Sequence, residues 1–260
     1  MKPNHLKLFS RELGAESAQN LVILHGLLGT SDNWLTLGKR FAETHRVHLI
    51  DQRNHGKSPH HIEHNYEAMA DDLMHYLNER NIQSASIIGH SMGGKTALMF
   101  ADRHPTRINK LIIADMAARA YTPQHAAIFD TLLSAPIAAA QSRSDVSAHL
   151  MNRLNDAGMV AFLMKNLRRN KSGGFSWRPN IPVLAKVIGV IVEEVPLNLN
   201  TLPTLAIYGG ESNYVNADDL QRYKLTCMRF QSHVIEKAGH WLHASHPEEF
   251  FKQIDAFLAD

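Results

Sequence analysis

The sequence predicts an α/β fold in which a mostly parallel central sheet carries helices on both faces. Short apolar runs rich in β-branched residues alternate with longer segments of helical periodicity. The runs are continuously apolar, as is typical of strands buried on both faces of a parallel sheet. At 260 residues the chain is long enough for a substantial core and short enough for a single domain.

Six segments are predicted as strands of this sheet. They are residues 21–26, 47–51, 85–90, 110–116, 204–210 and 232–239. Helices are expected between them, where capping residues precede apolar residues at helical spacing. The clearest are a helix that carries Trp34 and Leu37, one over 66–80, and a last one over 247–258 that opens with a proline and two glutamates.

The strand pattern stops between residues 121 and 195, where helical patterns are interrupted by the stretch RRNKSGGFSWRPN. We therefore expect a helical cap over 120–196, inserted after the strand that ends at Asp115. The core would consist of 1–119 and 197–260. Apolar cap residues would form a lid over Ser91 and supply an apolar acyl-binding site. These residues are Ile128, Leu132, Leu133, Phe162 and Leu163.

Charge and composition argue against several classes of function. A formal net charge of +2 is too balanced for general attraction to nucleic acid. No apolar stretch reaches the roughly 20 residues of a membrane span, and the N-terminus lacks the apolar region of a secretion signal. Cys227 is the single cysteine, so the fold needs no oxidising compartment and we expect a cytoplasmic protein.

Seventeen histidines raise the question of a metal site. The local groups at residues 60–64 and 240–246 lack the HExxH arrangement, which puts two ligands and a base on one helical face. Solvated loop histidines explain both groups more simply. We expect neither a metal nor an organic cofactor.

The strongest motif is a G-x-S-x-G at residues 89–93, with Ser91 at its centre. It follows the predicted strand ASII directly and precedes a predicted helix. In that setting the glycines allow a tight strand-to-helix turn that lifts the serine Oγ above the sheet. Ser91 is therefore the predicted nucleophile, and the alternative is a serine that only caps a helix.

A nucleophilic serine needs a general base, and His240 follows the last predicted strand in the loop KAGHWLH. This order along the chain is the one expected of such an enzyme. His243 is a nearby competitor. We favour His240 because it comes immediately after the glycine that ends the strand, where loops at a sheet edge gather catalytic groups.

Backbone N–H groups should stabilise the oxyanion that forms when serine attacks a carbonyl. Met92, directly after the nucleophile, would supply one donor. The loop HGLLG at 25–29 would supply the other, through Leu27. Gly26 and Gly29 also permit a tight turn, which is compatible with this role.

Together, HGLLGTSDNW, DQRNHGKS, GHSMGG and AGHWLH resemble the α/β-hydrolase superfamily over nearly the whole chain. The DNW after the HG motif and the RNHGKS loop are similar to those of YbfF-type esterases, small bacterial enzymes associated with hydrolysis of acyl-CoA thioesters and simple esters. The resemblance implies an α/β-hydrolase fold and a Ser-His-acid triad.

The acid of the triad departs from the commoner pattern of the superfamily. Ser212 stands where many relatives have an aspartate, and Glu211 lies one position earlier. Asp115, at the end of the strand KLIIAD, is the other candidate, and YbfF-type esterases resemble this arrangement. We favour Asp115 because the triad needs a buried carboxylate. The alternatives are Glu211 as the acid and Asp115 as a turn cap.

Four residues are candidates for substrate binding. Trp34 and Trp241 should flank the pocket mouth, although each could equally be core packing. Arg168 and Arg169 belong to a basic cluster in the cap that could meet the phosphates of coenzyme A, although a run of charges is usually a solvated face.

These residues predict a serine esterase or thioesterase acting on a small ester or acyl-CoA through an acyl-serine intermediate. A C–C bond hydrolase or cofactor-free haloperoxidase could use the same triad, and a non-catalytic ligand-binding protein could keep the fold. The oligomeric state, the acyl chain length and the physiological substrate stay open.

Overall fold

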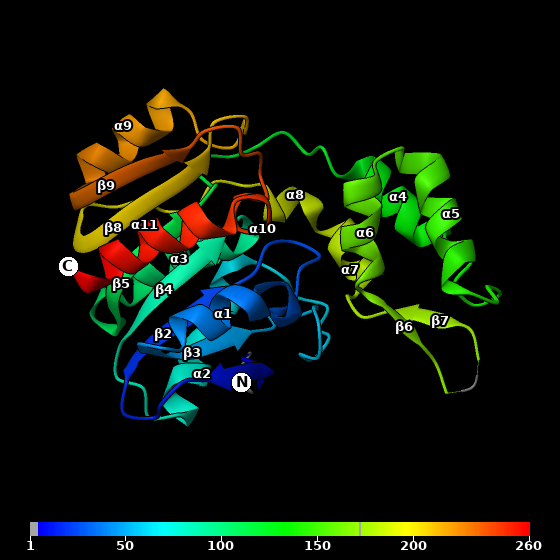
Figure 1. Cartoon of the computed structure of the whole chain (residues 1–260), viewed down its shortest axis with the longest axis horizontal. Coiled ribbons are helices and arrows are strands. Elements are labelled where there is room, and N and C mark those ends of the chain that lie inside the picture. The colour runs from blue at the N-terminus through cyan, green and yellow to red at the C-terminus, as the bar shows by residue number, and fades with distance from the viewer. Residues whose placement is uncertain (1–4, 172) are drawn as a thin grey trace.

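A computed structural model describes residues 5–171 and 173–260. Residues 1–4 of the predicted core and residue 172 of the predicted cap lie outside this description. A seven-stranded sheet has the order β1-β3-β2-β4-β5-β8-β9, and only β1 runs antiparallel to its neighbour (Figure 1). Its strands are β1 (Ser10–Leu13), β2 (Gln19–Leu24), β3 (His45–Ile50), β4 (Ala85–His90), β5 (Ile108–Ala114), β8 (Asn200–Gly209) and β9 (Cys227–Ile235).

Helices cover both faces of the sheet, as predicted. Side chains of α2 (Tyr66–Glu79) and α3 (Met92–Arg103) pack with Val22 and Ile87 in one apolar core. Side chains of α1 (Leu35–Phe41) and α11 (Pro247–Ala259) pack with Leu21 and Ile88 in a second core on the other face. The remaining helices of this part are α9 (Ala217–Thr226), the short α10 (Leu242–Ser245), and 3-10 turns at Ser31–Trp34 and Pro105–Arg107.

All six predicted strands are present, with boundaries shifted by a few residues. The short edge strand β1 was not predicted, because its four residues, SREL, contain no apolar run. The predicted helix around Trp34 begins as a 3-10 turn and continues as α1.

Residues 120–196 form a separate group of elements at the side of the molecule (Figure 1). Its helices are α4 (Ala126–Ser134), α5 (Arg143–Leu154), α6 (Ala157–Met164), α7 (Ile181–Lys186) and α8 (Ile188–Ile191). The stretch that interrupts the helical pattern contains an antiparallel strand pair, β6 (Leu167–Arg169) and β7 (Phe175–Trp177). We refer to residues 120–196 as the cap segment.

The two ends of the cap segment lie side by side on the core. Tyr121 N–H donates to Val192 O (2.8 Å), and Val195 N–H donates to Ala118 O (2.8 Å). The ammonium of Lys95, a buried residue of α3, donates to Arg119 O (2.8 Å) and to Glu193 O. A core helix therefore holds the entry and the exit of the cap segment.

Candidate active site

Ser91 lies at the sharp turn between β4 and α3 and has a positive φ of 54°. The turn requires glycine on both sides of the serine. A Cβ on Gly89 would lie 2.3 Å from Gly93 O, and a Cβ on Gly93 would lie 2.3 Å from Leu24 O. Because no side chain fits in these places, the G-x-S-x-G spacing is what lets β4 turn directly into α3.

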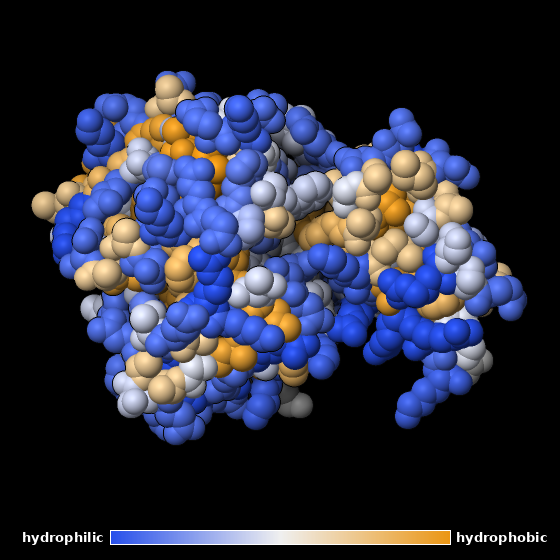
Figure 2. All heavy atoms as spheres, in the orientation of Figure 1, coloured by the Kyte–Doolittle hydropathy of each residue, from blue (hydrophilic) through white to orange (hydrophobic). Residues whose placement is uncertain are grey.

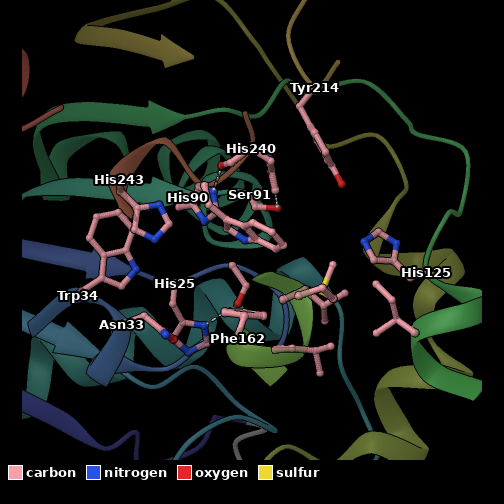
Figure 3. Close-up of a pocket in the computed structure, with 17 residues that line it drawn as sticks. His25, Asn33, Trp34, His90, Ser91, His125, Phe162, Tyr214, His240 and His243 are labelled. Atoms are coloured by element: carbon pink, nitrogen blue, oxygen red, sulfur yellow. Dashed lines mark hydrogen bonds between the residues drawn. The ribbon is translucent and has the colours of Figure 1, made fainter. Parts of the chain in front are cut away.

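His240 connects Ser91 to a carboxylate, and Figure 3 shows His240 beside Ser91. Ser91 Oγ donates to His240 Nε2 (2.9 Å), and His240 Nδ1 donates to Asp115 Oδ2 (2.7 Å). The three residues follow β4, β9 and β5, so the carboxyl ends of three strands bring them together. The tautomer with the proton on Nδ1 leaves Nε2 free to accept the serine proton.

Asp115 is fully buried and lies in the left-handed region, with φ of 48°. Its carboxylate accepts the Gly209 N–H (3.1 Å) and the Ser212 hydroxyl in addition to His240. The structure thus brings Asp115 to His240, whereas the side chain of Glu211 is exposed to solvent. Ser212 stands where many superfamily members have an aspartate, and its hydroxyl donates to the carboxylate of Asp115.

Two backbone N–H groups beside Ser91 have no acceptor in the described part of the chain. Met92 is the first residue of α3, where N–H groups lack an intrahelical acceptor. Leu27 lies in the loop after β2 and has no hydrogen bond from its N–H. Both can therefore donate to an oxyanion.

Buried histidines position the loop that carries Leu27. His55 Nε2 accepts the Leu28 N–H (3.1 Å), while His55 Nδ1 donates to Arg53 O (2.8 Å). His25 Nε2 accepts the Gln52 N–H (3.0 Å). Burial lowers the pKa of His25 and of His55, which favours the neutral form that these contacts need. Neither role was predicted, although His25 and His55 belong to the motifs HGLLG and DQRNHGKS.

Asp51 and Arg53 follow β3 and make structural contacts with separate partners. Arg53 pairs with Asp72 of α2, and both side chains are buried (Nε–Oδ2 2.7 Å). Asp51 accepts the backbone N–H groups of Ser31 (2.6 Å) and Lys57 (2.8 Å). Both residues therefore have structural roles in the loop after β3.

His243, the competing base, does not contact Ser91. Its ring is buried and stacks on Trp34, with ring centroids 4.3 Å apart and planes 6° apart. Burial lowers the pKa of His243 to about 3. His90 Nε2 donates to His240 O (2.8 Å) and so supports the loop of the base.

Two cavities meet at Ser91. The first, of about 100 Å³, is lined by Trp34, Trp241 and the cap residues Ile128 and Phe162, and is the cavity drawn in Figure 3. The second, of about 180 Å³, extends toward Met116, Tyr121 and Val192. Figure 2 shows apolar surface where the cap segment meets the rest of the molecule.

The other predicted lid residues have different environments. Leu132 and Leu163 are buried within the cap segment, and Leu133 is 52% exposed. Arg168 and Arg169 have exposed side chains on β6 and line neither cavity. The structure therefore does not bring these arginines to Ser91, because β6 pairs with β7 at the outer part of the cap segment.

Tyr214 and His125 were not singled out from the sequence, yet both line the two cavities. The Tyr214 ring stacks on His240 with centroids 3.8 Å apart. His125 precedes α4 and faces the site from the cap segment (Figure 3). Neither lies in a recognisable motif, so only the folded chain identifies them.

Within residues 5–171 and 173–260, no group of three or more histidine, cysteine, aspartate or glutamate side chains could hold a metal ion. In the same ranges, no helix is long and apolar enough to span a membrane.

Comparison with known proteins identifies the family. Residues 19–247 match the model of the alpha/beta hydrolase fold family, and the chain belongs to that family. It is 34% identical to Esterase YbfF of Escherichia coli over 95% of this chain and 98% of that protein. The predicted resemblance is therefore confirmed.

Two further relatives, a lipase and an esterase, are also similar to the chain over most of its length. The sn-1-specific diacylglycerol lipase ABHD11 of Mus musculus is 33% identical over 92% of this chain and 80% of that protein. A solved structure of a marine microorganism esterase superposes with a TM-score of 0.93 at 37% identity, covering 97% of this chain and 99% of that one. The chain is thus an α/β hydrolase with esterase and lipase relatives.

Proposed function

We propose that this protein is a serine esterase that hydrolyses small apolar carboxylic esters through an acyl-serine intermediate. The observation that carries the proposal is the hydrogen-bonded series Ser91–His240–Asp115, beside two cavities whose walls are more apolar than polar. The esterase and lipase relatives support the same class of reaction.

In the first half of the reaction, His240 Nε2 takes the proton of Ser91 Oγ as the oxygen attacks the ester carbonyl carbon. The carbonyl oxygen becomes an oxyanion that accepts the N–H groups of Leu27 and Met92. His240 then gives its proton to the leaving alcohol oxygen as the ester bond breaks. The products of this half are an acyl-serine and a free alcohol.

In the second half, His240 takes a proton from water, whose oxygen attacks the acyl-serine carbonyl. Collapse of this intermediate returns the proton to Ser91 and releases the carboxylic acid. Asp115 stabilises the imidazolium formed in each half. Ser212 and Gly209 orient the carboxylate and act as positioning residues.

A thioester can follow the same route, with sulfur as the leaving atom, so acyl-CoA stays within the proposal. The predicted contact between CoA phosphates and Arg168 or Arg169 receives no support from their positions, which is why we place carboxylic esters first. A cytoplasmic location remains part of this proposal.

The test combines covalent labelling with a substrate panel. A fluorophosphonate probe should label the wild-type protein and not Ser91→Ala, while Ser17→Ala, at an exposed loop serine, serves as the matched control. Panels of p-nitrophenyl esters and acyl-CoA thioesters would then rank the substrates. Absence of labelling in the folded wild-type protein would favour a non-catalytic ligand-binding role. Turnover by folded Ser91→Ala at the wild-type rate would show that Ser91 is not the nucleophile. Cleavage of a C–C bond with no esterase turnover would favour the C–C hydrolase alternative.

A further inference from the structure

The two cavities at Ser91 have different access to His240. Leu27, Ser91, His125 and Tyr214 line both cavities. His240 lines the first cavity, together with Trp34, Phe162 and Trp241, and is absent from the walls of the second. The two cavities therefore differ in whether a bound group can reach His240. This difference matters because His240 must protonate one part of the substrate, the leaving group.

The tetrahedral intermediate has four substituents on its central carbon: Ser91 Oγ, the oxyanion, the leaving group and the acyl chain. The oxyanion must face the N–H groups of Leu27 and Met92. The leaving atom must lie within hydrogen-bond reach of His240 Nε2, since that nitrogen returns the proton. The acyl chain takes the remaining direction.

We propose that the first cavity, on the His240 side, receives the leaving alcohol or thiol, and that the second cavity receives the acyl chain. This inference rests on the proposed function, and it names which part of the substrate each cavity selects.

The walls of the second cavity suit an apolar acyl group. Met92, Met116, Ile191 and Val192 form the apolar part of its wall, and the polar residues Arg119, Thr122, Gln124 and Asn213 also line it. Tyr66 also lines it, and its hydroxyl already donates to Ile191 O (2.6 Å), so that this polar group is satisfied within the protein. An aliphatic acyl chain would pack against the apolar part of this wall.

The walls of the first cavity suit a flat or apolar leaving group. The rings of Phe162 and Trp241 lie 5.5 Å apart between centroids, and Trp34 adds a third aromatic ring. Aromatic side chains provide large apolar contact faces. Phe162 and Ile128 come from the cap segment and line this cavity, so we assign to the leaving group two residues that were expected from the sequence at the acyl site.

Two narrowing variants test the assignment. Val192→Phe should fill the second cavity, and Ile128→Phe should fill the first. The first substrate series keeps p-nitrophenol as the leaving group and varies the acyl chain from acetate to octanoate. The second keeps butyrate as the acyl group and varies the alcohol from ethanol to 1-naphthol.

We expect Val192→Phe to lower kcat/KM for octanoate relative to acetate by about tenfold or more, the size of a pocket effect of one or a few methylenes. In the same variant, the ratio of kcat/KM between the ethanol and the 1-naphthol ester of butyrate should change little. Ile128→Phe should show the opposite pattern. Transient kinetics give a second readout, because all butyrate esters form the same acyl-enzyme: Val192→Phe should alter its hydrolysis rate, and Ile128→Phe should alter only its formation.

If Val192→Phe does not fold, Met116→Ala enlarges the same cavity and should raise the relative rate for octanoate. The assignment is wrong if Val192→Phe changes the selectivity for the alcohol and Ile128→Phe changes the selectivity for the acyl chain. It is also wrong if no variant of the second cavity changes the acyl selectivity. In both cases the esterase proposal still holds as long as the enzyme is active and labelled by the probe. Loss of labelling in the wild-type protein would instead remove the proposed function itself.

Discussion

The Leu28 N–H donates to His55 Nε2 across 3.1 Å, and this contact joins the loop after β2 to the loop after β3. Leu28 has a positive φ of 59°, a conformation that costs a non-glycine residue on the order of 1–3 kcal/mol. The bond to His55 helps to hold that conformation. Because Leu27 directly precedes Leu28, its N–H direction depends on the same loop.

His55→Phe should lower kcat by about tenfold to a hundredfold with a small change in KM, since loss of one oxyanion donor costs about 10²–10³ in kcat and this change disturbs a donor without deleting it. Steady-state kinetics with a short p-nitrophenyl ester measure it. His64→Phe is the matched control, because His64 is buried beside His55 and does not contact Leu28. Equal losses in both variants would reduce His55 to a packing role.

Asp115→Asn should lose several orders of magnitude in kcat, and Glu211→Gln should lose far less. The amide favours the wrong imidazole tautomer, which costs about 10⁴ in chymotrypsin-like proteases. Asparagine tolerates the positive φ of Asp115, so the backbone is expected to keep its conformation. Steady-state kinetics and thermal melts of both variants measure the effect. An inactive Glu211→Gln together with an active Asp115→Asn would make Glu211 the acid of the triad.

Local patterns explain how much of this site is predictable from sequence. Ser91 and His240 were predictable because each follows a buried strand in a short motif, and parallel strands end at one edge of the sheet. The contact between His55 and Leu28 was not, because it joins loops 27 residues apart and depends on side-chain direction.

Strand β1 and the hairpin of the cap segment escaped prediction for a related reason. Strands of three or four residues have too little periodicity to distinguish from loops, and only their partners make them strands. The pairing of Arg53 with Asp72 was likewise not predictable, because the two residues are 19 positions apart and only the packing of α2 brings the carboxylate to the guanidinium.

His243→Phe should make the protein more resistant to acid. The pKa of His243 is about 3 in the folded protein and near 6.5 when unfolded, so below pH 6.5 the unfolded chain binds a proton that the folded one excludes. Stability is therefore lost as the pH falls from 6.5 toward 3, by about 3 kcal/mol at pH 4 for this one group. Phenylalanine keeps the stack on Trp34 and removes the buried Nδ1 that has no partner in the described residues.

Urea unfolding at pH 7 and pH 4.5 measures this effect. The variant should lose less stability between the two pH values than the wild type. His246→Phe, at a partly exposed histidine of the same loop region, should keep the wild-type dependence. An unchanged acid dependence in His243→Phe would assign the sensitivity to the other buried histidines.

Lys95→Met should loosen the cap segment while the sheet stays intact. The ammonium of Lys95 donates to Arg119 O and Glu193 O, at the two ends of that segment. Methionine keeps the apolar stem and removes the donors, which leaves two partly buried carbonyl groups without this charged partner, at a cost of about 1–3 kcal/mol. Hydrogen exchange followed by mass spectrometry should show faster exchange at residues 118–121 and 192–195 than in β4 and β5.

Lys110→Met provides the matched control for this comparison. Lys110 Nζ donates to Phe257 O (2.9 Å) and Leu258 O (2.8 Å), so its loss also frees two carbonyl groups, but at the end of α11 and away from the cap segment. This control should lose comparable stability without faster exchange at the ends of the cap segment. Since the cap segment lines both cavities at Ser91, Lys95→Met should also raise KM for a p-nitrophenyl ester more than Lys110→Met does. Equal exchange and equal KM in the two variants would show that the lysine contributes only general stability.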